Sequence, residues 1–269
     1  MLGTTVYALD RPIERAAILS DLHVPDDGGP TFGALQAAIA AAVARRADLF
    51  LLGDVFDSYS SPAQVHVGIW RDTAAELRAA ARQGLAVFVL HGNRDFLLGD
   101  EFAAAAEATV VPGALQVDLA GAPTVLAHGD EFCVNDLPYL RAKRLLRGRF
   151  TRFLSDHLPL RAAMAIAARA RKRSKTTVMV GDQTRFLPTA NAVSTAFAFG
   201  ARRVVFGHIH RHARGSLAGG DYRVLPAFDA TGVGLWAEPG ELRPVHFGPG
   251  GVVEGVAEPG PCPFGPERG

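Results

Sequence analysis

The chain has 269 residues, of which 48% are hydrophobic, and its mean hydropathy is +0.13; these values exclude a largely disordered chain and fit one core domain with an inserted region. The formal net charge of +1 excludes little by itself, so the distribution of charge along the chain matters more. Two cysteines are too few for a disulfide framework, and without ~18 consecutive apolar residues any membrane contact would be peripheral.

The first half of the chain alternates apolar runs with amphipathic stretches, which predicts strands alternating with helices. Gly84 stands where the second of these helices would end. This alternation favours a sheet whose strands are joined by parallel crossovers. The predicted strands are Ala16–Ser20, Leu49–Leu52 and Ala86–Leu90, and the predicted helices are Phe32–Arg46 and Ala63–Arg82.

After Phe102 the strands become shorter and are separated by Gly and Pro. Both patterns fit an α/β fold in which a two-sheet β-sandwich is flanked by helices. We expect residues 1–136 and 176–247 to form this core, and residues 248–269, which are dense in Gly and Pro, to be a loosely packed tail. The later predicted strands are Val110–Val111, Leu115–Leu119, Thr124–Ala127, Arg203–Phe206, Tyr222–Leu225, Val233–Trp236 and Leu242–Phe247, with a helix at Thr189–Phe199.

Residues 137–175 form a basic, helical segment that we interpret as a lid inserted into the core. The segment contains twelve Lys or Arg and one acid, Asp156, so it carries +11 and leaves −10 on the rest of the chain. This asymmetry suggests that the segment faces an anionic partner. Its apolar side chains among arginines suit a membrane interface or acyl chains. The alternative is a hairpin that packs its apolar face on the core.

Five short polar motifs each follow an apolar run, at the point where a predicted strand ends. One such motif alone is usually an ordinary turn or helix cap. Ligands of open α/β sheets gather outside the carboxyl ends of the strands, so the five in order predict one shared site. The motifs are Asp21-Leu22-His23, Gly53-Asp54-Val55-Phe56-Asp57, Gly92-Asn93-Arg94-Asp95, His128-Gly129-Asp130 and Gly207-His208-Ile209-His210.

Carboxylate, imidazole and amide side chains make up these motifs, and together they suit a pair of divalent cations. Carboxylates alone would instead suggest Mg or Ca. We expect two Mn(II) ions, with Fe or Zn as alternatives that use the same side chains. The neighbouring glycines let the backbone turn sharply and let a phosphate approach closely.

The motifs resemble those of the calcineurin-like metallophosphoesterase superfamily, whose pattern of D-x-H, GD-x-x-D/N, GN-H/R-D, a central H and GH-x-H is present from Asp21 to His210. Two longer strings, HGNRDFLLG (His91–Gly99) and HGDEFCVNDLPYLRAKRLLR (His128–Arg147), resemble the UDP-2,3-diacylglucosamine pyrophosphatase family of lipid A biosynthesis. The resemblance implies hydrolysis of this nucleotide-linked lipid to UMP and 2,3-diacylglucosamine 1-phosphate.

Matched residue by residue, the resemblance implies that Asp54 bridges two metal ions. It further implies that Asp54, Asn93 and Arg94 are catalytic, with Arg94 contacting the phosphate where many relatives have His. One metal would also take Asp21, His23 and His210, and the other Asn93, His128 and His208.

Two further groups of residues are predicted around these ligands. We expect Asp95 and Asp130 to orient ligand imidazoles. The chain departs from the family in the string Asp57-Ser58-Tyr59, where relatives have an acid, a small residue and Trp, and in lacking the acidic stretch beyond it. The candidate substrate-binding residues are Arg94, Asp136, Tyr139, Ser174 and Lys175.

The hypothesis also concerns location and partners. With no leader-like segment visible, we expect a cytoplasmic protein whose basic lid contacts the inner membrane peripherally, with no nucleic-acid partner and no predicted oligomeric state. One alternative is a metallophosphoesterase acting on another nucleotide, phosphodiester or phosphomonoester. Arg94, at a position where many relatives have His, is evidence against this alternative. The other is a non-enzymatic membrane or nucleic-acid binding module, which would have no reason to keep all the expected ligands.

Overall fold

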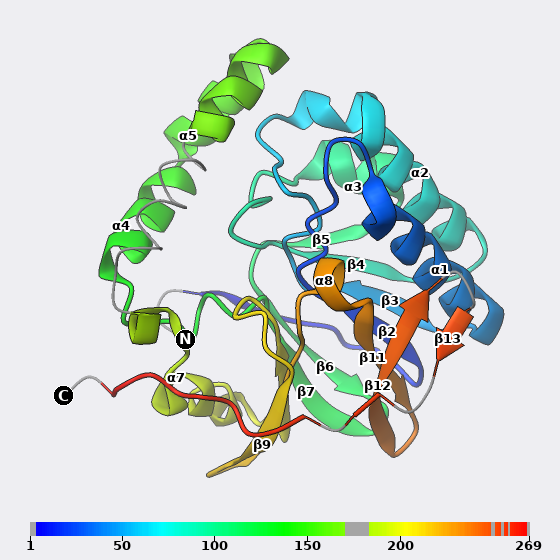
Figure 1. Ribbon diagram of the computed structural model, residues 1–269, viewed down its shortest axis with the longest axis vertical. Helices are drawn as coiled ribbons and strands as arrows, with labels where there is room; N and C mark the ends of the chain where they lie inside the picture. Colours follow the sequence, from blue (N-terminus) through cyan, green and yellow to red (C-terminus); the bar gives the residue numbers. More distant parts are fainter. Residues whose placement is uncertain (1–3, 170–182, 249–250, 254–255, 258, 268–269) are drawn as a thin grey trace.

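Two β-sheets face each other at the centre of the molecule, and helices cover their outer faces (Figure 1). The structure is a computed structural model, and it describes residues 4–169, 183–248, 251–253, 256–257 and 259–267. Ser174 and Lys175 lie outside the described residues. The predicted α/β fold, a two-sheet sandwich flanked by helices, is confirmed.

The strand order of the two sheets brings distant parts of the chain together. The first sheet runs in the order β13 (Gly251–Val253), β12 (Glu241–Gly248), β11 (Val233–Glu238), β2 (Ala16–Leu19), β3 (Asp48–Leu51), β4 (Val87–Leu90) and β5 (Thr109–Val111). The second runs in the order β1 (Val6–Ala8), β6 (Ala114–Leu119), β7 (Ala122–Leu126), β8 (Arg203–Phe206), β10 (Gly220–Val224) and β9 (Ala213–Leu217). Strands β2 to β5 are parallel, as the alternating pattern predicts.

Alternate residues of each buried strand face different layers. In β2, Ala17 and Leu19 pack with the helices α1 (Gly29–Arg45) and α2 (Gly68–Arg82), whereas Ile18 belongs to the core between the sheets. Leu49 and Phe50 of β3 divide in the same way. Because both faces of these strands are buried, their sequences are continuous apolar runs.

Several predicted elements differ from the observed ones in their bounds. The predicted helix Ala63–Arg82 is split into a 3-10 helix η1 (Pro62–His66) and α2, because Val67 is extended and Gly68 has a φ of +48°. Similarly, Thr189–Phe199 divides into α7 (Ala190–Ser194) and η3 (Phe197–Phe199). The sequence patterns do not predict strands β1, β9 and β13 or helices α3 (Asp100–Ala106) and α8 (Phe228–Thr231).

The segment predicted to be a lid is helical as far as it is described. It contains α4 (Leu137–Leu146), α5 (Arg149–His157) and further helical residues from 160 to 169. Figure 1 shows α4 and α5 standing along one side of the body. Leu145, Phe153 and Ile166 are exposed, with fractional exposures of 76%, 58% and 51%. These three side chains therefore do not fit the alternative of a hairpin that packs its apolar face on the core.

The expectation of a loosely packed tail is wrong for the described residues beyond 248. Strand β13 pairs with β12, and Gly260 forms a bridge with Ala213. Cys262 is buried and Phe264 packs into the cluster that covers the outer face of the second sheet. Gly and Pro here form an extended chain whose backbone is tied down, rather than a free end. None of the described helices is long and apolar enough to cross a membrane.

Candidate metal centre

The five motifs come together because the strands before them lie side by side. Strands β2, β3 and β4 are neighbours in the first sheet, and β7 and β8 are neighbours in the second. Backbone hydrogen bonds join the loops beyond them: Asp21 N–H donates to the Gly53 carbonyl at 3.2 Å, and Gly207 N–H donates to the His128 carbonyl at 2.8 Å. The carboxyl ends of both sheets therefore meet at one edge of the sandwich.

Most of the predicted ligands sit on unusual backbone. Five of them, Asp21, His23, Asp54, His208 and His210, have φ between +44° and +67°, the left-handed region that residues with a Cβ rarely adopt. Such strained residues persist only where surrounding contacts hold them, and they cluster at functional sites. The backbone itself thus marks these loops as a constrained site.

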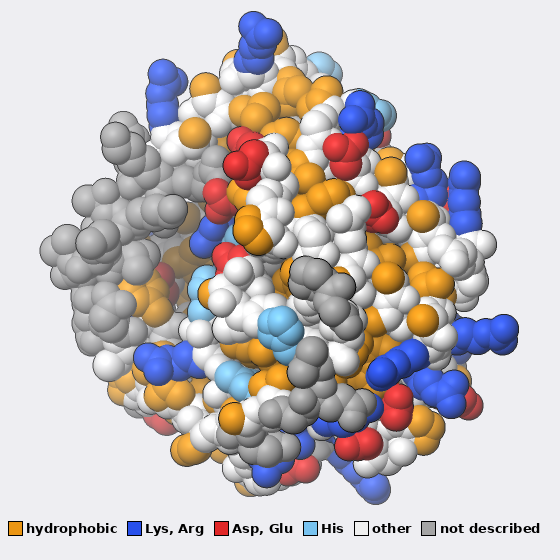
Figure 2. All heavy atoms as spheres, turned by 45° about the vertical axis from the view of Figure 1, so that its right-hand side comes forward, with side chains coloured by type: hydrophobic (Ala, Val, Ile, Leu, Met, Phe, Trp, Pro, Cys, Tyr) orange, Lys and Arg blue, Asp and Glu red, His pale blue; other side chains and the backbone are white. Residues whose placement is uncertain are grey.

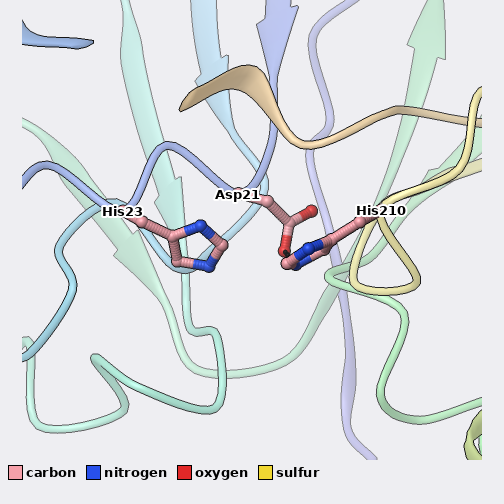
Figure 3. A group of neighbouring side chains, drawn as sticks. All are labelled: Asp21, His23 and His210. Carbon is pink, nitrogen blue, oxygen red and sulfur yellow. Dashed lines mark ion pairs between the residues drawn. The ribbon is translucent and has the colours of Figure 1, made fainter. Parts of the chain in front are cut away.

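Asp21 lies between the imidazoles of His23 and His210 (Figure 3). Ligand atoms of these three side chains are all within 4.8 Å of one another. One carboxylate oxygen, Asp21 Oδ2, accepts hydrogen bonds from Ser20 Oγ at 2.7 Å and from the His208 N–H at 2.8 Å. The other, Oδ1, is buried 3.4 Å from His210 Nε2, and among the described residues it has no hydrogen-bond partner. A bound cation would satisfy this oxygen.

The second group of predicted ligands surrounds His128. Its Nε2 is 3.0 Å from Asn93 Oδ1 and 3.2 Å from His208 Nδ1. Its Nδ1 lies 2.9 Å from the Leu52 carbonyl, so Nδ1–H donates there and Nε2 is left to face a ligand. Asp54 lies between the two groups, 3.4 Å from His23 Nε2 and 3.8 Å from His128 Nε2.

The seven predicted ligands are therefore brought together, with Asp54 in the position between two groups. They are Asp21, His23, Asp54, Asn93, His128, His208 and His210. The donor set of carboxylate oxygens, imidazole nitrogens and one amide fits divalent cations such as Mn, Fe or Zn. Histidine side chains, some beside acidic and basic ones, gather at the surface on the face shown in Figure 2.

Charges in the cluster control one another. Burial raises the pKa of Asp54, but the nearby His128 and the hydrogen bond from His23 hold it below its ordinary value. Burial lowers the pKa of His128, yet the carboxylates of Asp54 and Asp21 raise it to about 9. Burial and the charge on His128 lower the pKa of His208 to about 4. Without a cation, protonated His128 offsets the negative charge of the buried Asp54 and Asp21 carboxylates.

Two glycines make room for the carboxylates. A Cβ at Gly92 would overlap the Asp54 carboxylate, and a Cβ at Gly207 would overlap Ser20 Oγ and the Asp21 carboxylate. Neither clash can be relieved by a flexible side chain, because the carboxylates are themselves held by hydrogen bonds. The glycines in these motifs are thus required by packing around the ligand oxygens.

Arg94 lies at the rim of the cluster with its side chain 27% exposed. Its Nε is 3.3 Å from Asp54 Oδ2, and its Nη1 donates to Asp57 Oδ1 at 2.6 Å. Its backbone N–H donates to Asp54 Oδ1 at 2.9 Å. In the sequence, Asp57 belongs to one of the five motifs but has no predicted role. In the structure Asp57 fixes the direction of the guanidinium.

Asp95 was expected to orient a ligand imidazole. Its carboxylate instead accepts hydrogen bonds from three backbone N–H groups, those of Gly92, Val55 and Asp54, at 2.8, 2.7 and 3.3 Å. Burial and the charge on Asp54 raise the pKa of Asp95 to about 6. Asp95 therefore joins the loops beyond β3 and β4, and acts on the ligands through the backbone.

Asp130 was also expected to orient an imidazole, but its contacts run to α4. The Tyr139 hydroxyl donates to Asp130 Oδ2, and Lys143 Nζ is 2.7 Å from the same oxygen. Asp136 caps α4 by accepting from the Tyr139 N–H at 3.3 Å. Arg147 Nη2 donates to the Gly92 carbonyl at 3.1 Å. Helix α4 is thus attached to the loops that carry the candidate ligands.

Asp229 contacts the candidate site, although it is not among the residues predicted from the sequence. Asp229 at the start of α8 lies with its Oδ2 3.0 Å from His23 Nδ1, so that Nε2 of His23 faces Asp54. The backbone N–H groups of Phe228 and Asp229 reach the Asp21 carbonyl at 3.1 and 3.4 Å. Asp229 directly follows the apolar residues Leu225–Phe228, as the polar motifs follow their apolar runs, and this pattern could have predicted it.

Comparisons of sequence and of structure find proteins that are similar to this chain. The family model for calcineurin-like phosphoesterases matches residues 14–212. Proteins named UDP-2,3-diacylglucosamine hydrolase are 32% identical in Pseudomonas fluorescens and 34% identical in Pseudomonas syringae pv. syringae, each match covering 76% of this chain and 82% of the relative. Vacuolar Protein Sorting 29 from Cryptosporidium parvum matches structurally with a TM-score of 0.46 at 13% identity, over 90% of this chain and 96% of that one.

Proposed function

The chain belongs to the calcineurin-like phosphoesterase family, and we propose that it hydrolyses the pyrophosphate bond of UDP-2,3-diacylglucosamine to UMP and 2,3-diacylglucosamine 1-phosphate. The observation that carries this proposal is the convergence of five strand-end motifs around Asp54. The relatives whose names state this substrate cover most of the chain, which supports the lipid over another phosphodiester.

The candidate ligands would hold two divalent cations, Mn(II) with Fe or Zn as alternatives. Asp21, His23 and His210 would hold one, and Asn93, His128 and His208 the other, with Asp54 shared. The chemistry supplied at such a site is activation of water and neutralisation of phosphate charge. The proton on His128 Nδ1, directed to the Leu52 carbonyl, keeps Nε2 available as a ligand.

Arg94 would bind the phosphoryl oxygens directly. Its guanidinium is permanently charged and presents a planar fork, which suits two non-bridging oxygens better than an ammonium group does. Asp57 aims this fork and Asp54 lies against its Nε, so the group is ordered before substrate arrives. Preorganised charge of this kind stabilises the transition state of phosphoryl transfer.

The lid is proposed to bind the substrate's remaining parts. Asp136 and Tyr139 lie at the start of α4 and would face the nucleotide and sugar portion. The exposed apolar side chains of Leu145, Phe153 and Ile166, on a segment rich in arginine, favour contact with acyl chains at the surface of the inner membrane. Ser174 and Lys175 remain sequence-based candidates.

The function is tested with protein purified in the presence of Mn(II). Release of UMP from UDP-2,3-diacylglucosamine is measured beside hydrolysis of bis-p-nitrophenyl phosphate, with Asp54→Asn as the control. We expect far more efficient cleavage of the lipid and loss of both activities in the variant. Cleavage of the small diester alone would mean that the centre is a phosphoesterase site with a different substrate.

A further inference from the structure

Residues 260–267 near the C-terminus run past α7 toward the base of α4 (Figure 1). We call this segment the strap. It lies beyond the residues matched by the phosphoesterase family model, which end at 212. The strap is therefore an addition to the part of the chain that carries the candidate ligands, and its contacts indicate what it does.

The strap contacts two described segments that flank the lid in sequence, which we call the first and second stems. On the first stem, residues 132–136, the Asn135 Nδ2 donates to the Pro266 carbonyl at 2.7 Å. On the second stem, residues 183–191, Gly265 N–H donates to the Pro188 carbonyl at 2.9 Å, and Glu267 Oε1 accepts from the Asn191 N–H at 3.0 Å. One short segment thus holds two stems that are distant in sequence.

The two stems also contact each other beneath the strap. Thr189 N–H donates to the Phe132 carbonyl at 3.1 Å, and Cys133 Sγ donates to the Phe186 carbonyl at 3.1 Å. The cysteine is buried. The two stems and the strap therefore form one junction of three chain segments, in which a shift of one segment displaces the others.

The strap is itself fixed to the second sheet. Arg214 N–H donates to the Gly260 carbonyl at 2.9 Å, and Cys262 N–H donates to the Tyr222 hydroxyl at 3.2 Å. Phe264 packs edge-on against the Tyr222 ring, with ring centroids 5.4 Å apart. A segment anchored in this way to a buried sheet can impose a position on the stems, whereas a free end cannot.

The first stem leads directly into the substrate side of the site. Asn135, which the strap holds, is followed by Asp136, the cap of α4, and one turn later by Tyr139, whose hydroxyl donates to Asp130. Few residues separate the strap from the side chains proposed to face the nucleotide and sugar. A displacement of Asn135 by a fraction of an ångström would shift the start of α4.

We propose that the strap is a positioning element that fixes the base of the lid and so sets the place of Asp136 and Tyr139 for the nucleotide-linked lipid. This inference rests on the proposed function. Its described contacts are with the stems and the second sheet, so it acts on substrate binding and leaves the metal centre's own chemistry unchanged.

The chain offers a matched pair of glycines for the test. A Cβ at Gly265 would come 2.8 Å from the Thr184 carbonyl and 3.4 Å from the Leu187 carbonyl, both on the second stem, so Gly265→Ala must push the strap away. Among the described residues, no atom comes within 4 Å of a Cβ at Gly260, so Gly260→Ala adds the same methyl group to the same segment without a clash there.

We expect Gly265→Ala to raise KM for UDP-2,3-diacylglucosamine about threefold to tenfold, because small misplacements of binding groups are costly. The kcat for bis-p-nitrophenyl phosphate, the bound Mn(II) and the thermal midpoint of Gly265→Ala are measured in parallel. The diester activity and metal content are expected to stay at wild-type values, and Gly260→Ala is expected to match wild type throughout.

A second variant guards against a simple folding defect. Asn135→Ala removes one hydrogen bond to the strap without changing the backbone, and we expect a smaller rise in KM in the same direction. Because both changes act through one junction, the double variant should be no worse than Gly265→Ala alone. Unchanged KM in both single variants, or an equal loss on the small diester, would overturn the strap's role. Absence of lipid hydrolysis in the wild type would instead refute the proposed function.

Discussion

At the candidate metal centre, each of seven side chains lies within 3.4 Å of another candidate ligand, whereas the described part of the lid, residues 137–169, touches the core at scattered points. The Asp54 carboxylate, for example, has three neighbours at this centre: His23, His128 and Arg94. The lid contacts the core through the pairing of Asp130 with α4, through Arg147 Nη2, which donates to the Gly92 carbonyl at 3.1 Å, through the Ser61 hydroxyl, which donates to the Ser155 carbonyl at 3.3 Å, and through Met164. We therefore expect changes at the metal centre to affect every substrate, and changes in the lid to affect the lipid more than a small diester.

Replacing a ligand should affect every substrate alike. Asp21→Asn keeps the size of the side chain but removes the charge of the carboxylate that lies 3.4 Å from His210 Nε2. We expect both the lipid and bis-p-nitrophenyl phosphate activities to fall by more than about a hundredfold, with reduced Mn(II) content. Elemental analysis of the purified variant checks the metal. Full activity with full metal content would remove Asp21 from the set of ligands.

Removing the lid should instead separate the substrates. Replacing residues 137–175 by a short Gly/Ser linker is expected to reduce UMP release from the lipid by at least about a hundredfold, because the binding energy of the remote parts of the substrate is lost. Hydrolysis of the small diester should survive. Equal loss of both activities would show that the segment supports the fold of the site.

The carboxylate that holds His23 should show an intermediate effect. Asp229→Ala frees His23 Nδ1 and is expected to weaken Mn(II) affinity about tenfold to a hundredfold. Asp229→Asn retains an acceptor oxygen and should lose less. Metal titration at equilibrium compares the two variants. If Asp229→Ala binds Mn(II) as tightly as wild type, the orientation of His23 depends on the strained backbone alone.

Metal affinity should also depend on pH. In the metal-free site the carboxylates of Asp54 and Asp21 raise the pKa of His128 to about 9, so below that pH a cation must displace a proton. Mn(II) affinity is therefore expected to rise with pH and to level off near pH 9, by up to about tenfold per pH unit. Calorimetric titrations in two buffers of different ionisation enthalpy measure the released proton. An affinity that does not change between pH 7 and 9 would contradict this.

The smallest effect is expected where α4 meets the core. Tyr139→Phe removes the hydroxyl that donates to buried Asp130, and Lys143 still pairs with that carboxylate at 2.7 Å. We expect KM for the lipid to rise about threefold to tenfold, corresponding to about 1 kcal/mol for one hydrogen bond. The diester activity should not change. A parallel loss on the diester would mean that Asp130 acts on the ligands after all.

The sequence located most of the site because its ligands follow apolar runs. A buried strand must be apolar and must end where polar residues begin, so Asp21, Asp54 and His208 could be placed at strand ends without coordinates. The same rule predicted the parallel strands of the first sheet. It also would have found Asp229, had the apolar residues before it been read in the same way.

The directions of side chains could not be predicted in this way. Asp95 and Asp130 each stand close to a candidate ligand in sequence, yet one turns to backbone N–H groups and the other to α4. The packing of the residues beyond 248 could not be predicted either, because Gly and Pro content indicates only how much surface a segment can bury by itself. Its anchoring depends on Tyr222 and Asn135, which lie far away in sequence.

The left-handed backbone at the ligand positions implies a conflict between durability and activity. At Asp21, glycine would adopt a φ of +55° at less cost than aspartate does. Selection for thermal robustness alone would therefore drift toward glycine in these loops and erase the catalyst. The acids and histidines at these positions therefore carry a cost in backbone strain, and we attribute their presence to the proposed metal site.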